Sequence, residues 1–250
     1  MKYQLYCIFE KPCDRVVRLP TRLTQSQIHL TERQGLCAAF SEISLAAAVR
    51  DTAEFMNYHN VIESVFDQVT LVPFRFGTVL DEKADIDRLL ENRNAQYREI
   101  LRNLEGCVEI GIRAMIAENG VPAERNDSTT EFPSQDRPNP GTRYLALRKA
   151  HFDSETSQTE VNNCVIERCR AAFAGMFRAF KNEISRLGSE REQRGACLLS
   201  LYFLVPRESL DSFRREFAAL ASERSSKLLF IGPWPPYNFV LPGDPPTRLS

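Results

Sequence analysis

The chain has 250 residues, 43% of them hydrophobic, which is enough for one large or two small domains with buried cores. Its 32 Lys and Arg residues nearly balance 33 Asp and Glu residues, so the net charge of -1 provides no overall positive field for nucleic acid or an anionic membrane. The longest near-continuous apolar run, Leu198 to Val205, is far shorter than the ~20 residues of a spanning helix. We therefore expect no nucleic-acid partner and no membrane segment.

The cysteines and the first residues indicate the compartment. Seven cysteines occur without a CxxC pair or a regular framework, which is unlike a disulfide-stabilised secreted domain and favours a reducing cytoplasm. The chain becomes charged at Glu10 and Lys11 before the apolar core of a signal peptide is complete. We expect a cytoplasmic protein.

The first third of the chain predicts a small sheet and a helix. Apolar residues alternate from Tyr3 to Phe9, and a second apolar stretch runs from Gly35 to Phe40, so both are expected as strands. Asp51 to Glu54 has capping-box spacing, and helical periodicity then predicts a helix from about Asp51 to Asp67. The apolar residues of this helix are Phe55, Tyr58, Ile62, Val65 and Phe66. We expect them to face the core.

A proline-containing segment and a second helix complete the expected first domain. Val69 to Thr78 has β propensity, but Pro73 cannot donate to a ladder, so an edge, an irregular strand or a strand end is expected there. Apolar spacing from Ile86 to Leu104 predicts one amphipathic helix that ends at Gly106. This closes an N-terminal α+β domain at residues 1–106.

The second half predicts a β-α-β-α-β order. Val108 to Ile116 alternates as a strand with one apolar face, and the polar, proline-rich residues 117–141 are expected to form a mobile loop. An apolar stripe from Val161 to Leu187 predicts one long helix that ends at Gly188. A central strand at Leu198 to Val205, a helix around Leu210 to Leu220 and a final strand at Leu228 to Ile231 follow.

No catalytic motif is recognisable. Nucleotide-binding, acyl-transfer and zinc-protease signatures are absent from the sequence. His59 and Glu63 share a helix face, but two ligands fall short of a metal site. Cys164 and Cys169 are interpreted as small buried hydrophobes. We therefore expect no enzyme, no metal and no cofactor.

Two irregular segments are not explained by ordinary core building. In the first, Pro73, Arg75, Phe76 and Gly77 follow one another closely. Arg75 either clamps a carboxylate of a partner or satisfies buried carbonyls between the domains, and the structural role is favoured. The second segment contains Gly232, Pro233, Trp234, Pro235, Pro236, Tyr237 and Phe239. It is expected to be extended, near polyproline II, either as a ligand for another protein or, as favoured, as a tail anchored by its own aromatic residues.

These segments resemble the F/L-type gas vesicle proteins, which carry a V-P-x-R-F-G-T-like stretch and a G-P-W-P-P-Y-x-F-V-like C-terminus. The corresponding residues here are Val72 to Thr78 and Gly232 to Val240. The resemblance implies an α+β protein of two domains. The second domain, residues 107–250, would be a modified ferredoxin-like fold with the loop 117–141 and the tail 232–250.

The resemblance also implies a role in the cytoplasm and on gas vesicles. The chain would be a minor structural or assembly protein that binds the hydrophobic gas vesicle wall protein, with other gas vesicle proteins as further partners. The alternative, a ferredoxin-like ligand-binding or thiol-dependent catalytic module, rests on the β-α-β-α-β order and the cysteines. Because the helix stripes are expected to be consumed by the core, the contact surface is predicted at an exposed sheet edge or at the loop.

Overall fold

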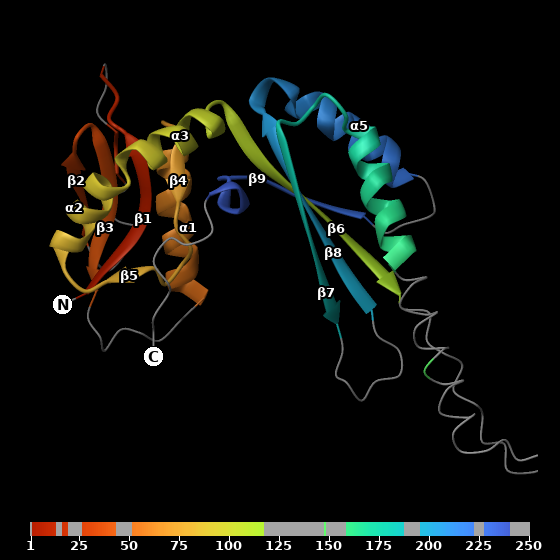
Figure 1. Ribbon diagram of the computed structural model, residues 1–250, viewed down its shortest axis with the longest axis horizontal. Helices are drawn as coiled ribbons and strands as arrows, with labels where there is room; N and C mark the ends of the chain where they lie inside the picture. Colours follow the sequence, from red (N-terminus) through yellow and green to blue (C-terminus); the bar gives the residue numbers. More distant parts are fainter. Residues whose placement is uncertain are drawn as a thin grey trace, which may run out of the picture. The chain divides into compact units, whose positions relative to one another are not determined.

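The computed structural model describes residues 2–13, 17–19, 27–43, 52–117, 148, 159–187, 196–222 and 228–240 (Figure 1). They form two compact units. The first contains the chain up to Ile110, Phe203–Leu210 and the segment from Gly232 onward, and the second contains Gly111–Tyr202 and Asp211–Ile231. The predicted boundary divides the chain at one point, residue 106, whereas each compact unit combines segments from different parts of the sequence. The tail from Gly232 belongs to the first unit and not to the second.

The first unit is built on a five-stranded sheet. Its strands are β1 (Lys2–Glu10), β2 (Ile28–Arg33), β3 (Leu36–Ile43), β4 (Leu71–Pro73) and β5 (Val79–Leu80). The order is β2-β3-β1-β4, β5 also pairs with β1, and all of these pairs are antiparallel. Gln34 and Gly35 connect β2 to β3 with φ values of 50° and 79°, as a two-residue hairpin turn requires. Strand β4 ends at Pro73, as predicted from its missing N–H.

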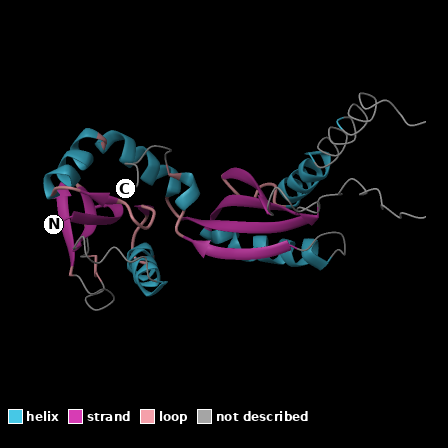
Figure 2. Cartoon of the chain, turned by 90° about the horizontal axis from the view of Figure 1, so that it is seen from below, coloured by secondary structure: helices cyan, strands magenta, loops and turns pink. Residues whose placement is uncertain are grey.

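Both faces of the central strand β1 are buried. The prediction placed one apolar face on this strand, but all five residues from Leu5 to Phe9 are buried. Helices α1 and α3 both contact β1, and Figure 2 shows helices above and below this sheet. A strand enclosed on both faces takes apolar residues at consecutive positions, which explains the run Leu5 to Phe9.

The helices of the first unit match the prediction in part. Helix α1 (Thr52–Phe66) lies where it was expected. The single helix predicted up to Leu104 is wrong, because two helices, α2 (Lys83–Asn92) and α3 (Asn94–Leu104), replace it. Arg93 separates them with φ −114° and ψ 19°, and it lies between two asparagines, which favour turns and caps over helix interiors. Gly106 follows α3 with φ 69°, the conformation expected at a helix end.

The second unit contains most of a four-stranded sheet with the order β7-β8-β6-β9. The strands are β6 (Cys107–Ala117), β7 (Ala179–Leu187), β8 (Ala196–Pro206) and β9 (Leu228–Trp234). Helix α5 (Leu210–Ser222) follows a short 3-10 turn, Arg207–Ser209, and residues 159–172 are also helical. Both sheets of the chain are antiparallel, so the predicted α+β class is confirmed.

The long helix predicted from Val161 to Leu187 is wrong. Its helical part ends near residue 172, Gly175 adopts φ 79°, and Ala179–Leu187 is strand β7. Glycine in the left-handed region ends a helix without a steric penalty, and the apolar residues beyond it suit a strand equally well. The element order is therefore β-α-β-β-α-β rather than β-α-β-α-β, and the ferredoxin-like assignment stays a prediction.

Aromatic side chains join the second sheet to its helices. Phe173, just after the helical residues 159–172, stacks on Phe213 of α5 with ring centroids 4.0 Å apart. Phe230 of β9 contacts both Phe213 and Phe217 edge-on. These contacts place the core between one sheet face and its helices. In the described residues, no helix is long and apolar enough to span a bilayer.

Candidate functional site

The two motif segments meet around Tyr58 of α1. Its hydroxyl donates to the carbonyl of Leu5 at 2.7 Å and lies 3.1 Å and 3.2 Å from the carbonyls of Phe74 and Arg75. Burial raises the pKa of Tyr58 well above its ordinary value, and the next contribution comes from Tyr237 in the second motif. One buried tyrosine thus links β1 to the turn after β4, and the next residue of α1, His59, contacts Trp234 of the tail.

The first motif forms a tight turn after β4. Pro73 is paired with Cys7 of β1, and Phe74 is buried. Gly77 adopts φ 87°, and the Thr78 hydroxyl donates to the carbonyl of Arg75 at 2.8 Å. This turn brings Phe76 onto the rings of α1, and the motif residues therefore shape the backbone next to β1.

The side chain of Arg75 is exposed, and the carbonyls of Phe74 and Arg75 itself are approached by the hydroxyl of Tyr58. Sequence reasoning missed Tyr58 because a tyrosine in a helical stripe looks like any other core residue. Both interpretations of Arg75, a contact with buried carbonyls between the domains and a contact with a carboxylate of a partner, stay predictions.

Exposed apolar side chains of α1 lie next to the turn that contains Arg75 and Phe76. Phe55 and Met56 of α1 are 50% and 49% exposed, and the ring of Phe76 contacts Phe55 at 5.7 Å and Tyr58 at 5.3 Å. We call Phe55, Met56, Phe76 and Arg75 the α1 patch. The expectation that the core consumes the whole apolar stripe of this helix is wrong at Phe55. Exposed aromatic, methionine and arginine side chains are the types enriched at protein interfaces.

The second motif is not a continuous polyproline II segment. Strand β9 extends through Gly232 and Pro233 to Trp234, and Tyr237–Phe239 form one 3-10 turn. Gly232 has φ 113°, and a Cβ atom there would lie 2.8 Å from the carbonyl oxygen of Glu109. Glycine is therefore required at this position both by conformation and by space.

A buried carboxylate holds the tail. Glu109 of β6 is 4% exposed, and its Oε2 and Oε1 accept the Asn238 backbone N–H at 2.8 Å and the side-chain Nδ2–H at 2.6 Å. Trp234 packs edge-on against His59 of α1, with centroids 4.9 Å apart. Burial is also the main cause that raises the pKa of Tyr237. These contacts hold the tail within the first unit and support the anchored-tail interpretation for Trp234 and Tyr237.

Glu109 was not identified from the sequence. In the alternating strand from Val108 to Ile116 it occupies a position that would face solvent, whereas the structure buries it. The alternation carries no sign of this, because the partner, Asn238, lies 129 residues further along the chain. From the sequence alone, a charged residue on a strand fits a solvent-facing position and a buried, hydrogen-bonded position equally well.

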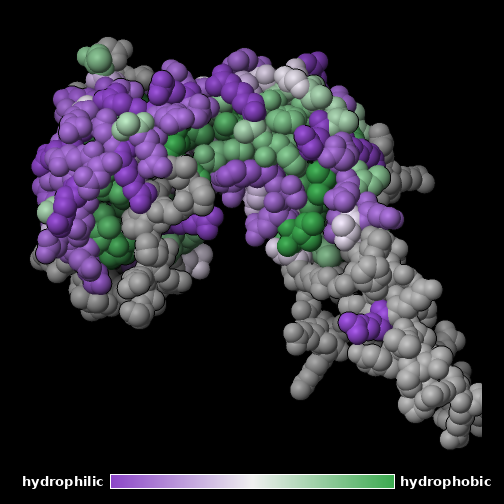
Figure 3. All heavy atoms as spheres, in the orientation of Figure 1, coloured by the Kyte–Doolittle hydropathy of each residue, from purple (hydrophilic) through white to green (hydrophobic). Residues whose placement is uncertain are grey.

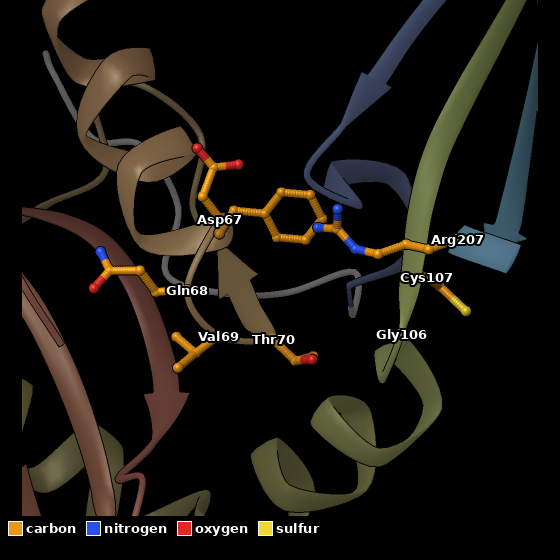
Figure 4. A pocket seen from close by; sticks show the side chains of 8 residues that line it. Asp67, Gln68, Val69, Thr70, Gly106, Cys107 and Arg207 are labelled. Carbon is orange, nitrogen blue, oxygen red and sulfur yellow. The ribbon is translucent and has the colours of Figure 1, made fainter. Parts of the chain in front are cut away.

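A small pocket opens at the end of α1 (Figure 4). It has a volume of about 200 Å³ and is lined by residues that include Phe66, Asp67, Thr70, Gly106 and Arg207, all in the first unit. The Arg207 guanidinium carbon lies 4.7 Å from the centroid of the Phe66 ring. This volume is below the roughly 300–1,000 Å³ of small-molecule sites, so the pocket suits a single side chain.

The described His, Cys, Asp and Glu side chains give little support to a metal site or a thiol site. No group of three or more His, Cys, Asp or Glu that could hold a metal exists within the described parts of the chain. Burial raises the pKa of the Cys7 and Cys37 thiols, and that of Cys169 to about 11. Because the thiolate is the reactive form, these three cysteines give the thiol-dependent alternative little support.

The sequence matches the family model of gas vesicle synthesis proteins GvpL/GvpF over residues 3–241. The chain belongs to the GvpL/GvpF family. Gas vesicle protein L of Streptomyces sp. is 28% identical over 80% of this chain and 75% of its own length. Gas vesicle protein F1 of Halobacterium salinarum is 22% identical over 86% of this chain and 81% of its own length.

Solved structures of GvpF proteins share the fold. GvpF from Anabaena sp. PCC7120 superposes with a TM-score of 0.66 at 17% identity, over 97% of both chains. GvpF from Microcystis aeruginosa gives a TM-score of 0.67 at 16% identity, over 95% of this chain and 98% of that one. The sequence resemblance to F/L-type gas vesicle proteins is therefore confirmed, and the GvpL/GvpF fold accommodates both motifs.

Proposed function

We propose that this chain is a gas vesicle minor structural or assembly protein that binds the hydrophobic wall protein in the cytoplasm during vesicle formation. The observation that carries the proposal is the match to gas vesicle synthesis proteins over residues 3–241. Relatives named gas vesicle protein F and L support the same process. Other gas vesicle proteins are further candidate partners.

The role answers a physical problem of the wall. A subunit that presents an apolar face to gas is prone to aggregate before it polymerises. A protein that covers this face during assembly suppresses wrong pairing. It needs an exposed apolar surface on a stable scaffold, together with polar groups that limit its own aggregation.

The α1 patch has these properties. Phe55 and Met56 are half exposed, the tight turn after β4 holds Phe76 against Phe55, and the exposed Arg75 precedes Phe76 in that turn. Covering the exposed half of one such side chain contributes about 1 kcal/mol, since complete burial is worth roughly 1.5–3 kcal/mol. The contact predicted from the sequence at an exposed sheet edge or at the loop 117–141 stays a prediction, and most of that loop lies outside the described residues.

Deletion of the gene from a vesicle-forming host tests the proposed function. We expect absent or misshapen vesicles, restored by the wild-type gene and only partly restored by a Phe55→Ser, Phe76→Ser double variant. Electron microscopy and buoyancy measure the outcome. Normal buoyant vesicles in the deletion strain would show that the chain is not needed for assembly.

A further inference from the structure

Arg207 is held in place at the mouth of the pocket shown in Figure 4. Its backbone N–H donates to the carbonyl of Gly106 at 2.8 Å, directly before β6. Its guanidinium lies over the ring of Phe66, the last residue of α1. A guanidinium stacked on an aromatic face keeps its in-plane N–H groups available for a second partner.

No carboxylate among the described residues pairs with Arg207. Other arginines of the first unit are paired: Arg33 with Asp87, and Arg98 with Glu10. Asp67 lines the same pocket, but Figure 4 shows its carboxylate directed away from Arg207. The Arg207 guanidinium is therefore positioned by the Phe66 ring, and no described carboxylate binds it.

The volume of the pocket and the charges that line it indicate which class of ligand it can bind. About 200 Å³ is room for one side chain and is less than a cofactor needs. The hydroxyl of Thr70 is a donor in the wall, whereas Asp67 opposes a second negative charge. A singly charged carboxylate meets these conditions better than a phosphate, and guanidinium binds it with two parallel hydrogen bonds.

We infer that this pocket is a socket for a carboxylate side chain, Asp or Glu, of a bound protein segment. The chemistry also admits a small free carboxylic acid. The protein segment is favoured because the pocket has room for one side chain and because Arg207, which lines it, is exposed and of a type enriched among interface hot-spot residues. Only this choice of source rests on the proposed function.

Titration of the full-length ¹⁵N-labelled chain with capped glutamate, N-acetyl-glutamate N-methylamide, tests the chemistry by NMR. Capped glutamine is the neutral control. We expect saturable shifts at the Arg207 Nε–H and at the Gly106 and Thr70 amides with capped glutamate, and at least tenfold weaker effects with capped glutamine. Equal responses to the two compounds, or no saturable response, would overturn the socket.

Matched variants localise the effect. Arg207→Ala is expected to remove the response at Gly106 and Thr70, and Arg207→Lys to weaken it because an ammonium lacks the planar fork. Arg102→Ala, at the exposed end of α3, is the control and should respond as wild type. If Arg207→Ala fails to fold, Phe66→Leu provides the second test, because loss of the ring is expected to reduce the response severalfold. An unchanged response in a folded Arg207 or Phe66 variant contradicts the inference.

A second arm identifies the source of the carboxylate. Binding of the purified wall protein to the wild-type and Arg207→Ala chains is compared, with an expected loss of at least fivefold in the variant. Capped-glutamate binding combined with equal wall-protein binding overturns the protein-segment choice and assigns the socket to a free acid. If the wall protein fails to bind even the wild-type chain, the proposed function fails while the NMR result still decides the socket.

Discussion

Replacing Glu109 by alanine removes both acceptors that hold the Asn238 end of the tail. The carboxylate is buried and accepts hydrogen bonds of 2.8 Å and 2.6 Å from Asn238. Hydrogen bonds to a charged group contribute about 1.5–3 kcal/mol each, and the variant also leaves donors without their partner. Because removal of the buried charge offsets part of this loss, we expect the free energy of unfolding to fall by about 2–4 kcal/mol.

Trp234 makes the effect measurable at the tail itself. It is the only tryptophan of the sequence and packs against His59, so its fluorescence reports whether the tail is docked. In Glu109→Ala, the emission is expected to shift to longer wavelength and iodide quenching to increase at urea concentrations where far-UV circular dichroism is still native. Glu99→Ala, on the exposed surface of α3, is the matched control and should stay within about 0.5 kcal/mol of wild type.

Two results would show that Glu109 does not hold the tail. One is a Glu109→Ala protein with wild-type stability and an unchanged Trp234 spectrum. The other is an equal loss in Glu99→Ala, which would show that the loss is not specific to the tail contact. Glu109→Gln is a milder variant. Its amide keeps one acceptor oxygen for Asn238, but its NH₂ group faces the second donor of Asn238 and cannot accept a hydrogen bond from it. We expect an intermediate loss for this variant.

Three further predictions concern backbone, pH and binding. Gly232→Ala is expected to cost about 1–3 kcal/mol in urea unfolding, because φ is 113° and the new Cβ meets a carbonyl at 2.8 Å, whereas Gly111→Ala, with its nearest contact at 3.6 Å, should be far milder. The raised pKa of Cys169, about 11 against 9.0, means that the folded state retains a proton the unfolded state loses, so stability falls as pH rises from 9 to 11. Cys169→Ala should flatten this decline; an unchanged slope would exclude that thiol as its source. Phe55→Ser should weaken wall-protein binding about fivefold in a titration, whereas Leu30→Ser, also an exposed apolar residue of the first unit, should not.

Local signals in the sequence predicted those elements whose causes are local. Helix α1 carries its apolar periodicity within 15 residues, Gly106 ends α3, and Pro73 ends β4. Each depends on the chemistry of a few neighbouring residues. These features were therefore predicted correctly without knowledge of the tertiary structure.

Features that depend on distant residues were missed. The apolar residues on both sides of Gly175 fit one helical stripe, and only packing against the sheet distinguishes strand β7 from a continued helix. Tyr58 and Glu109 gain their roles from carbonyls and an amide elsewhere in the chain.

Binding of the purified wall protein to the purified chain is the decisive measurement for the proposed function. We expect saturable binding that a Phe55→Ser, Phe76→Ser double variant weakens by at least tenfold while its circular dichroism shows that it is folded. Parallel titrations with each co-encoded vesicle protein show whether this partner is preferred. If the natively folded chain does not bind the wall protein, the proposed function is wrong.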